Sequence, residues 1–267
     1  MRLKCTGSVL NAGELRLGNM KSILFALLLS ISISAGAAIH KDSVTNYILE
    51  DKDIEKQAAS KWTPAELERA NTAKNVKYLN AEEKKIIFYM NLARMDGKRF
   101  FDTYFQQYID EHNLRMKQYS NYREVRVSRN DPYYRGLEQD LRDVKDLGLL
   151  YPDETLTYVA QQHGKDMNKR NLAGHNSSDG RTMVDRIQKY YPNRGMAENL
   201  AFGFSSGLAN VSLLLLDKGV ADLGHRKNIL NKTLGINIVG VSIQPHPHYK
   251  YSATIDFVAI PNLKIPQ

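Results

Sequence analysis

Histidine and carboxylate side chains gather in four short polar segments in the second half of the chain. The segments span residues 174–180, 197–200, 216–219 and 224–231, and they contain His175, Glu198, Asp217 and His225. Two neutral imidazoles offer nitrogen ligands to Zn²⁺ and similar divalent cations, while carboxylates offset the charge and leave a position open for water. Brought together in a fold, these groups can therefore bind a metal.

The same groups can instead perform general acid–base catalysis. In that interpretation Glu198 orients one imidazole, and the imidazole activates water or the hydroxyl group of Ser177 or Ser178. The candidates for such a role are His175, Glu198 and His225. Both interpretations stay open, because the residues alone do not show which groups meet.

Other polar residues in these segments have simpler structural interpretations. Asn199 follows Glu198, and the pair can hydrogen-bond loop backbone and hold a turn. We expect Arg226 and Asn228 to order the loop beneath His225 rather than to touch a ligand.

Helical patterns predict the elements that flank the polar segments. Helix starts are expected at Thr63, with Pro64 in the first turn, and at Asn80, whose helix runs to about residue 95. A further helical pattern covers residues 98–109, and Thr182 begins a short helix. A helix is also expected over residues 208–216, where four consecutive leucines indicate burial on most sides.

One predicted helix places a histidine among apolar side chains. The helix opens at Asp153, and its apolar positions follow the 3.6-residue period: Leu156, Val159, Ala160, His163 and Met167. His163 therefore faces inward and is expected to be a core histidine rather than a ligand.

The end of the sequence changes to alternating apolar residues, which is typical of strands. Residues 236–241 and 249–257 predict an antiparallel hairpin joined by a proline-containing turn at 244–248. His246 and His248 have a spacing that metals can use, but we expect this turn to be exposed and both side chains to be solvated. Helices first and a hairpin last favour a layered α+β domain over a parallel array.

Composition excludes several classes of protein. The chain has 267 residues, a net charge of +8 and a single cysteine, Cys5, so no internal disulfide is possible. Residues 1–37 contain four basic and one acidic residue, and the remainder carries a net charge of +5. That charge is ordinary for solubility and forms no concentrated basic stripe, so no nucleic-acid partner is expected.

Residues 20–37 have the pattern of a secretory signal peptide. A lysine follows Met20, residues 23–33 are apolar, and the small residues 35–37 form a cleavage motif after which the mature chain would begin at Ala38. We therefore expect a secreted protein, extracellular or periplasmic, with no stable membrane span in the mature chain. Residues 1–19 precede the expected natural start at Met20.

The predicted organisation has three parts. Residues 1–37 hold the upstream residues and signal peptide, residues 38–79 form a helical extension, and residues 80–260 form the main domain. Residues 110–136 are charged, rich in tyrosine and arginine, and broken by Asn130-Asp131-Pro132. They are expected to be an insertion or a long surface connection.

Several motifs together resemble a known family. In chain order they are the helix at 86–94, His163 to Met167, His175 with 178–180, Ala197-Glu198-Asn199, and residues 224–230. This order and spacing is similar to the CAP superfamily of cysteine-rich secretory, antigen 5 and pathogenesis-related proteins (the SCP domain), in its disulfide-free bacterial branch. The resemblance covers about residues 80–258.

The resemblance implies an α-β-α sandwich with a cleft where two histidines and two acidic residues meet. By motif the histidines are His175 and His225, and the first acid is Glu198. The second acid is usually a glutamate; here Asp217 lies nearest that place, with Asp222 as a rival. The shorter aspartate would hold its carboxylate about one methylene further back.

Three functions follow from the resemblance and the residues. The first is a secreted protein whose cleft binds a lipid, glycan or peptide, with zinc or another divalent metal at His175 and His225. The second is a metal- or histidine-dependent hydrolase of an extracellular polymer or peptide. The third is a non-catalytic scaffold that binds a partner protein.

Overall fold

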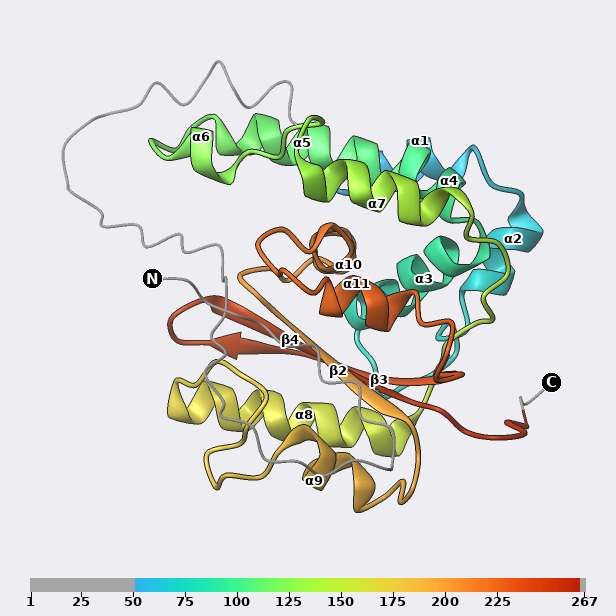
Figure 1. Ribbon diagram of the computed structural model, residues 1–267, viewed down its shortest axis with the longest axis vertical. Coiled ribbons are helices and arrows are strands. Elements are labelled where there is room, and N and C mark those ends of the chain that lie inside the picture. Colours follow the sequence, from blue (N-terminus) through green and yellow to red (C-terminus); the bar gives the residue numbers. More distant parts are fainter. Residues whose placement is uncertain (1–50, 265–267) are drawn as a thin grey trace.

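The computed structural model describes residues 51–264 (Figure 1). Its helices are α1 (Asp51–Ala59), α2 (Pro64–Ala70), α3 (Ala81–Met95), α4 (Gly97–Phe100), the π-helix η1 (Phe101–Phe105), α5 (Gln106–Met116), α6 (Tyr122–Val125), α7 (Pro132–Arg142), α8 (Glu154–Arg170), α9 (Met183–Gln188), α10 (Gly207–Leu216) and α11 (Gly224–Ile229). Its strands are β1 (Tyr151–Pro152), β2 (Met196–Phe202), β3 (Ile238–His246) and β4 (Lys250–Val258). The predicted signal peptide and the first part of the predicted extension lie outside the described residues.

The four strands form one mixed sheet in the order β1-β3-β4-β2. The hairpin expected near the end of the chain is confirmed as β3 and β4, which pair antiparallel. Strand β2 pairs antiparallel with β4 at one edge, and β1 pairs parallel with β3 at the other. Strand β2, which carries Glu198 and Asn199, is therefore an edge strand.

Helices cover both faces of the sheet, so the predicted α+β class and α-β-α sandwich are confirmed. Figure 1 shows α8 and α9 on one face and α3, α10 and α11 on the other. Side chains alternate between the faces along each strand. Ile238 and Val258 pack with Leu156 on the α8 side, whereas Val241 and Ile255 belong to the larger core on the opposite side.

The predicted helix starts are confirmed in atomic detail. Thr63, Asn80 and Thr182 are each the N-cap of a helix, and each forms a reciprocal capping box with the acidic residue three positions later. Two backbone N–H groups that the helix leaves unpaired are satisfied in every case. None of the helices within residues 51–264 combines the length and the apolar character needed to span a bilayer.

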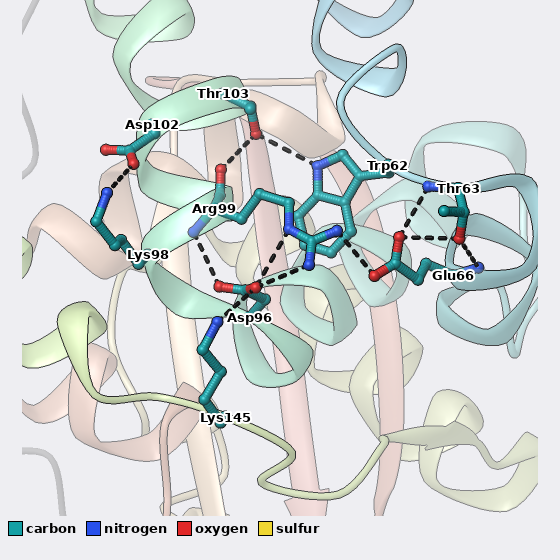
Figure 2. A network of polar contacts seen from close by, with 9 residues as sticks. All are labelled: Trp62, Thr63, Glu66, Asp96, Lys98, Arg99, Asp102, Thr103 and Lys145. Atoms are coloured by element: carbon teal, nitrogen blue, oxygen red, sulfur yellow. Dashed lines mark hydrogen bonds and ion pairs between the residues drawn. The ribbon is translucent and has the colours of Figure 1, made fainter.

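The described part of the N-terminal extension packs into the main core. Ile54, Ala58 and Trp62 are buried in the same apolar cluster as α3. Figure 2 shows how polar contacts fasten this junction: the Arg99 guanidinium lies 4.6 Å from the centre of the Trp62 ring and forms an ion pair of 2.8 Å with Glu66. The extension is thus fixed to the start of α4.

Residues 110–136 differ from the expected surface connection. They contain the end of α5, all of α6 and the start of α7, and Val125, Val127 and Tyr134 are buried. The side chain of Asn113 both donates to and accepts from the backbone of Val127 at 2.8 Å. Together with α1, this region forms an outer helical layer beyond α10 (Figure 1).

Candidate functional site

A buried carboxylate holds His175 in place. Glu198 projects from β2 with only 1% of its side chain exposed, and its Oε1 lies 2.7 Å from Nδ1 of His175. Its Oε2 accepts a hydrogen bond of 2.5 Å from Nη2 of Arg186 in α9. Arg186 also donates to the carbonyl oxygen of His175 at 2.8 Å, so one guanidinium orients both members of the pair.

The surroundings of Glu198 keep it ionised. Burial by itself would raise the pKa of Glu198, but the Arg186 charge, the His163 ring and the hydrogen bond from His175 lower the pKa overall. An ionised carboxylate can only accept hydrogen bonds, so Nδ1 of His175 carries the proton in this pair. The Nε2 atom of His175 then has a lone pair available for a ligand.

A second buried acid lies beside Glu198. Asp256 on β4 is the direct cross-strand neighbour of Glu198 and is fully buried. Burial and the neighbouring Glu198 charge raise the pKa of Asp256 well above its ordinary range, against the Arg186 charge. Asp256 therefore keeps its proton while its neighbour is charged.

His225 is held in the same way by Asp217. Asp217 ends α10 in the left-handed conformation with a φ of 53°, which aspartate tolerates better than most residues. Its Oδ1 lies 2.7 Å from Nδ1 of His225, and its Oδ2 accepts the backbone N–H groups of His225 and Arg226. Asp222 instead accepts from the backbone of Gly224, so the structure pairs His225 with Asp217.

Three further predicted residues connect the two pairs to the fold. Buried Arg226 donates to the carbonyl oxygens of Leu215 and Leu216 at the end of α10, and it reaches Asp140 of α7 at 2.9 Å. Asn228 donates to the side chain of Asn199 at 2.9 Å, and Asn199 donates to the carbonyl oxygen of His225 at 3.1 Å.

The two imidazole–carboxylate pairs are tied to opposite faces of the edge strand β2, one through the Glu198 side chain and the other through the backbone carbonyl group of His225. Glu198 and Asn199 are consecutive strand residues, so their side chains point to opposite faces of the sheet. Glu198 meets His175 on the side of α8 and α9, whereas Asn199 meets His225 on the side of α10 and α11. The interpretation of these two residues as a loop is thus wrong: they lie in an edge strand.

The serines near His175 are occupied elsewhere. Ser178 donates from its hydroxyl group to Asp166 at 2.6 Å and from its backbone N–H to the same carboxylate at 2.7 Å. The Oγ atom of buried Ser177 accepts from Arg186 at 3.2 Å. The contacts of these serines within the described chain do not include the His175 ring.

The donor chemistry fits a metal only through the two imidazoles. Among residues 51–264, no cluster of three or more histidine, cysteine or acidic side chains is arranged to hold a metal ion. The carboxylates of Glu198 and Asp217 are occupied by Nδ1 atoms, which is the usual outer support of a metal-bound histidine. His175 and His225 thus remain the predicted ligands, through Nε2.

The other histidines of interest have structural contacts. His163 is buried, as expected, and its Nε2 lies 2.9 Å from the carbonyl oxygen of Gly174. The expectation of a solvated His246 is wrong, because its side chain is buried and both ring nitrogens are used. Its Nε2 donates to Leu172 at 2.7 Å, and its Nδ1 accepts from the backbone of His248 and Tyr249.

Sequence reasoning missed Arg186 and Asp256. Arg186 shares the inner face of α9 with Met183 and Ile187, at the i, i+3 and i+4 positions, and a basic residue there is a signal that could have found it. Asp256 gives no such signal, because it alternates with apolar residues as a solvent-facing strand residue would.

Residues 133–259 match the CAP family, described as the cysteine-rich secretory protein family. The matched region contains both imidazole–carboxylate pairs.

Two solved structures are similar to the chain. An outer surface protein from Borrelia burgdorferi has 19% identity and a TM-score of 0.38, with 51% of this chain and 97% of that chain covered. An extracellular protein containing a SCP domain from Bacillus anthracis str. Ames has 26% identity and a TM-score of 0.34, with 61% and 42% covered. No curated protein matches the chain.

Proposed function

We propose that this protein is a secreted CAP-domain protein that binds a ligand at its two imidazole–carboxylate pairs, with zinc or another divalent metal at His175 and His225. One observation carries the proposal: each Nδ1 atom lies 2.7 Å from a carboxylate whose side chain is only 1% exposed. Each ring is therefore fixed in orientation with Nε2 left as its metal-binding atom.

The protein would supply only two ligands to such a metal, and this number determines what else the metal can bind. Two imidazoles leave the remaining positions of a four-coordinate ion to water or to an oxygen of the ligand. Glu198 and Asp217 orient the rings rather than coordinating the ion. We expect a lipid, glycan or peptide to be bound through an oxygen atom.

Secretion is part of the proposal and rests on the sequence. Residues 20–37 combine a basic start, an apolar run and a small-residue cleavage motif, and the family description is secretory. Either the periplasm or the exterior of the cell suits such a leader. Recovery of a mature chain that begins at Ala38 from a secreted fraction would support this part of the proposal, whereas retention of uncleaved chain in the cytoplasm would contradict it.

The experiment is a zinc titration by calorimetry on the chain from Ala38 onward, beside a His175→Ala/His225→Ala double variant. We expect a Kd near the micromolar range, about −8 kcal/mol, and loss of binding in the double variant with an unchanged circular dichroism spectrum. His248→Ala is the matched control, because His248 is an exposed histidine in the hairpin turn.

Two results would overturn the metal proposal. One is absence of zinc binding to the parent chain. The other is binding that persists in the double variant and disappears in His248→Ala. A hydrolase would use the same two pairs as general bases, and turnover lost in Glu198→Gln with zinc binding retained would favour that function.

A further inference from the structure

A pocket of about 390 Å³ lies between α8, α9 and the segment that joins them. Its size is within the range of small-molecule sites, roughly 300–1,000 Å³. The four residues of the imidazole–carboxylate pairs do not line it. The lining combines a polar floor, two tyrosines and several charged side chains. This pocket is therefore distinct from the site proposed above, although it adjoins that site through Arg186.

The floor of the pocket is buried and polar. It includes His163, Ser177 and Arg186, all of them buried. His163 donates from Nε2 to Gly174, so its Nδ1 is a hydrogen-bond acceptor, and no partner for Nδ1 exists within the described chain. Nε of Arg186 is a donor that likewise has no partner among the described residues. A hydroxyl group, which both donates and accepts, complements such a lining.

The mouth of the pocket carries two exposed aromatic rings. Tyr158 is 49% exposed and Tyr190 is 39% exposed, and they account for two of the three exposed large hydrophobic side chains in the described part of the chain. Their ring centres are 6.5 Å apart, at an interplanar angle of 82°. Exposed tyrosines at a pocket mouth offer an apolar face and a hydroxyl group to the same ligand.

The charge on the rim is positive and only partly compensated. Lys165 and Lys169 are neighbours at i and i+4 on α8, a like-charge arrangement that costs helix stability. Neither lysine, nor Lys189, has an ion-pair partner within residues 51–264; Lys189 lies over the Tyr190 ring at 5.2 Å. Arg181, by contrast, is paired with Asp179.

We propose that this pocket binds a sugar unit that carries an acidic group, namely a carboxylate, sulfate or phosphate. The two tyrosines offer faces on which a sugar ring packs, the polar lining suits its hydroxyl groups, and the three lysines attract its charge. Asp166 and Asp179 interrupt the basic rim, which disfavours a continuous polyphosphate backbone such as that of a nucleic acid.

The test measures binding of four probes to the mature chain by calorimetry: tetragalacturonate, a heparin tetrasaccharide, neutral maltotetraose and inorganic sulfate. A fifth probe, a single-stranded oligothymidylate of eight nucleotides, tests for binding of a nucleic acid. We expect at least one acidic oligosaccharide to bind with a Kd below about 1 mM, at least tenfold tighter than maltotetraose and sulfate, and more weakly at high salt.

Exposed side chains provide variants that should fold normally. Lys165→Gln/Lys169→Gln and Tyr158→Ala/Tyr190→Ala should each weaken binding at least tenfold. Lys61→Gln/Lys117→Gln removes the same charge from exposed lysines outside the pocket and should have little effect. Binding should also survive in His175→Ala/His225→Ala, which separates this site from the zinc proposal.

Four outcomes would overturn the inference. They are no binding of either acidic oligosaccharide, equal binding of sulfate alone, tighter binding of the oligothymidylate, and an equal loss of affinity in the control lysine variant.

Discussion

Two neighbouring acids, one on the edge strand β2 and one on β4, have opposite protonation states. Glu198 stays ionised because Arg186 and His175 hold its two oxygens, whereas Asp256, its cross-strand neighbour, keeps a proton. Two buried charges side by side would repel strongly, so a neutral Asp256 lowers the cost of burying the pair.

This arrangement predicts how stability depends on pH. The pKa of Asp256 is raised in the folded state, so unfolding releases its proton above pH ~4 and this residue's contribution to stability falls as pH rises toward the folded pKa. Asp256→Asn keeps the size and polarity of the side chain without a titrating proton. Relative to the parent, its free energy of unfolding should therefore increase with pH from about pH 4 up to the folded pKa of Asp256, by at most about 1.4 kcal/mol per pH unit.

Urea unfolding from pH 4.5 to 7.5 checks this prediction. Asp146→Asn is the matched control for removing a carboxylate, because the Asp146 side chain lies on the surface. A stability difference between Asp256→Asn and the parent that stays constant with pH would show that Asp256 is ionised in the folded protein.

At the residue scale, spacing along the chain predicted the candidates but not their environment. His175, Glu198, Asp217 and His225 could be selected as side-chain types beside glycines and turns. Arg186 could not be linked to Glu198, because that ion pair depends on α9 packing against β2. His246 was misjudged because the turn around it folds back onto Leu172.

Between elements, two glycines permit contacts that no other residue would allow. A Cβ atom on Gly240 of β3 would lie 2.2 Å from the carbonyl carbon of Leu156 in α8. A Cβ atom on Gly207 of α10 would lie 2.7 Å from the carbonyl oxygen of Glu82 in α3. Both obstacles are backbone atoms, so the helices themselves must move to make room.

We expect Gly240→Ala to destabilise the protein by about 3 kcal/mol or more and Gly207→Ala by about 1–3 kcal/mol. Gly195→Ala is the control, because its Cβ would meet nothing closer than 3.6 Å, and it should change stability by no more than about 0.5 kcal/mol. Thermal unfolding followed by circular dichroism measures all three. Equal effects for Gly240→Ala and Gly195→Ala would mean that α8 adapts freely.

The helices with strong caps were predictable, and the two missed features have clear physical causes. Strand β2 escaped because Glu198 and Asn199 interrupt its apolar residues, although both are buried and satisfied by partners from other elements. The region 110–136 escaped because its few buried residues are separated by charged ones. In both cases the structure is determined by tertiary contacts, which the local sequence pattern does not reveal.

At the scale of the whole molecule, the described N-terminal helices are part of one cooperative core. The chain has a single tryptophan, Trp62, which is buried between the extension and α4. Its indole N–H donates to Thr103 at 3.4 Å, and Arg99 covers its ring (Figure 2). Tryptophan fluorescence therefore reports directly on this junction.

We expect the urea transitions measured by tryptophan fluorescence and by far-ultraviolet circular dichroism to coincide. Arg99→Ala removes the guanidinium from the Trp62 ring and from Glu66, and it should lower the free energy of unfolding by about 1–3 kcal/mol. The control is Lys98→Ala, at the residue before Arg99, which removes an exposed ion pair with Asp102. It should lower the free energy of unfolding by less than about 0.5 kcal/mol. A fluorescence transition at clearly lower urea would show that the extension unfolds on its own.

The position of β2 between the two imidazole–carboxylate pairs has a consequence for the evolution of this site. His175 comes from the segment between α8 and α9, whereas His225 comes from α11. A change in α9 thus reaches His175 through Arg186, and a change in α7 reaches Arg226 beside His225. Substitutions that remove one imidazole–carboxylate pair therefore leave the contacts of the other pair in place. Homologues with a single surviving pair are the expected intermediates of such loss.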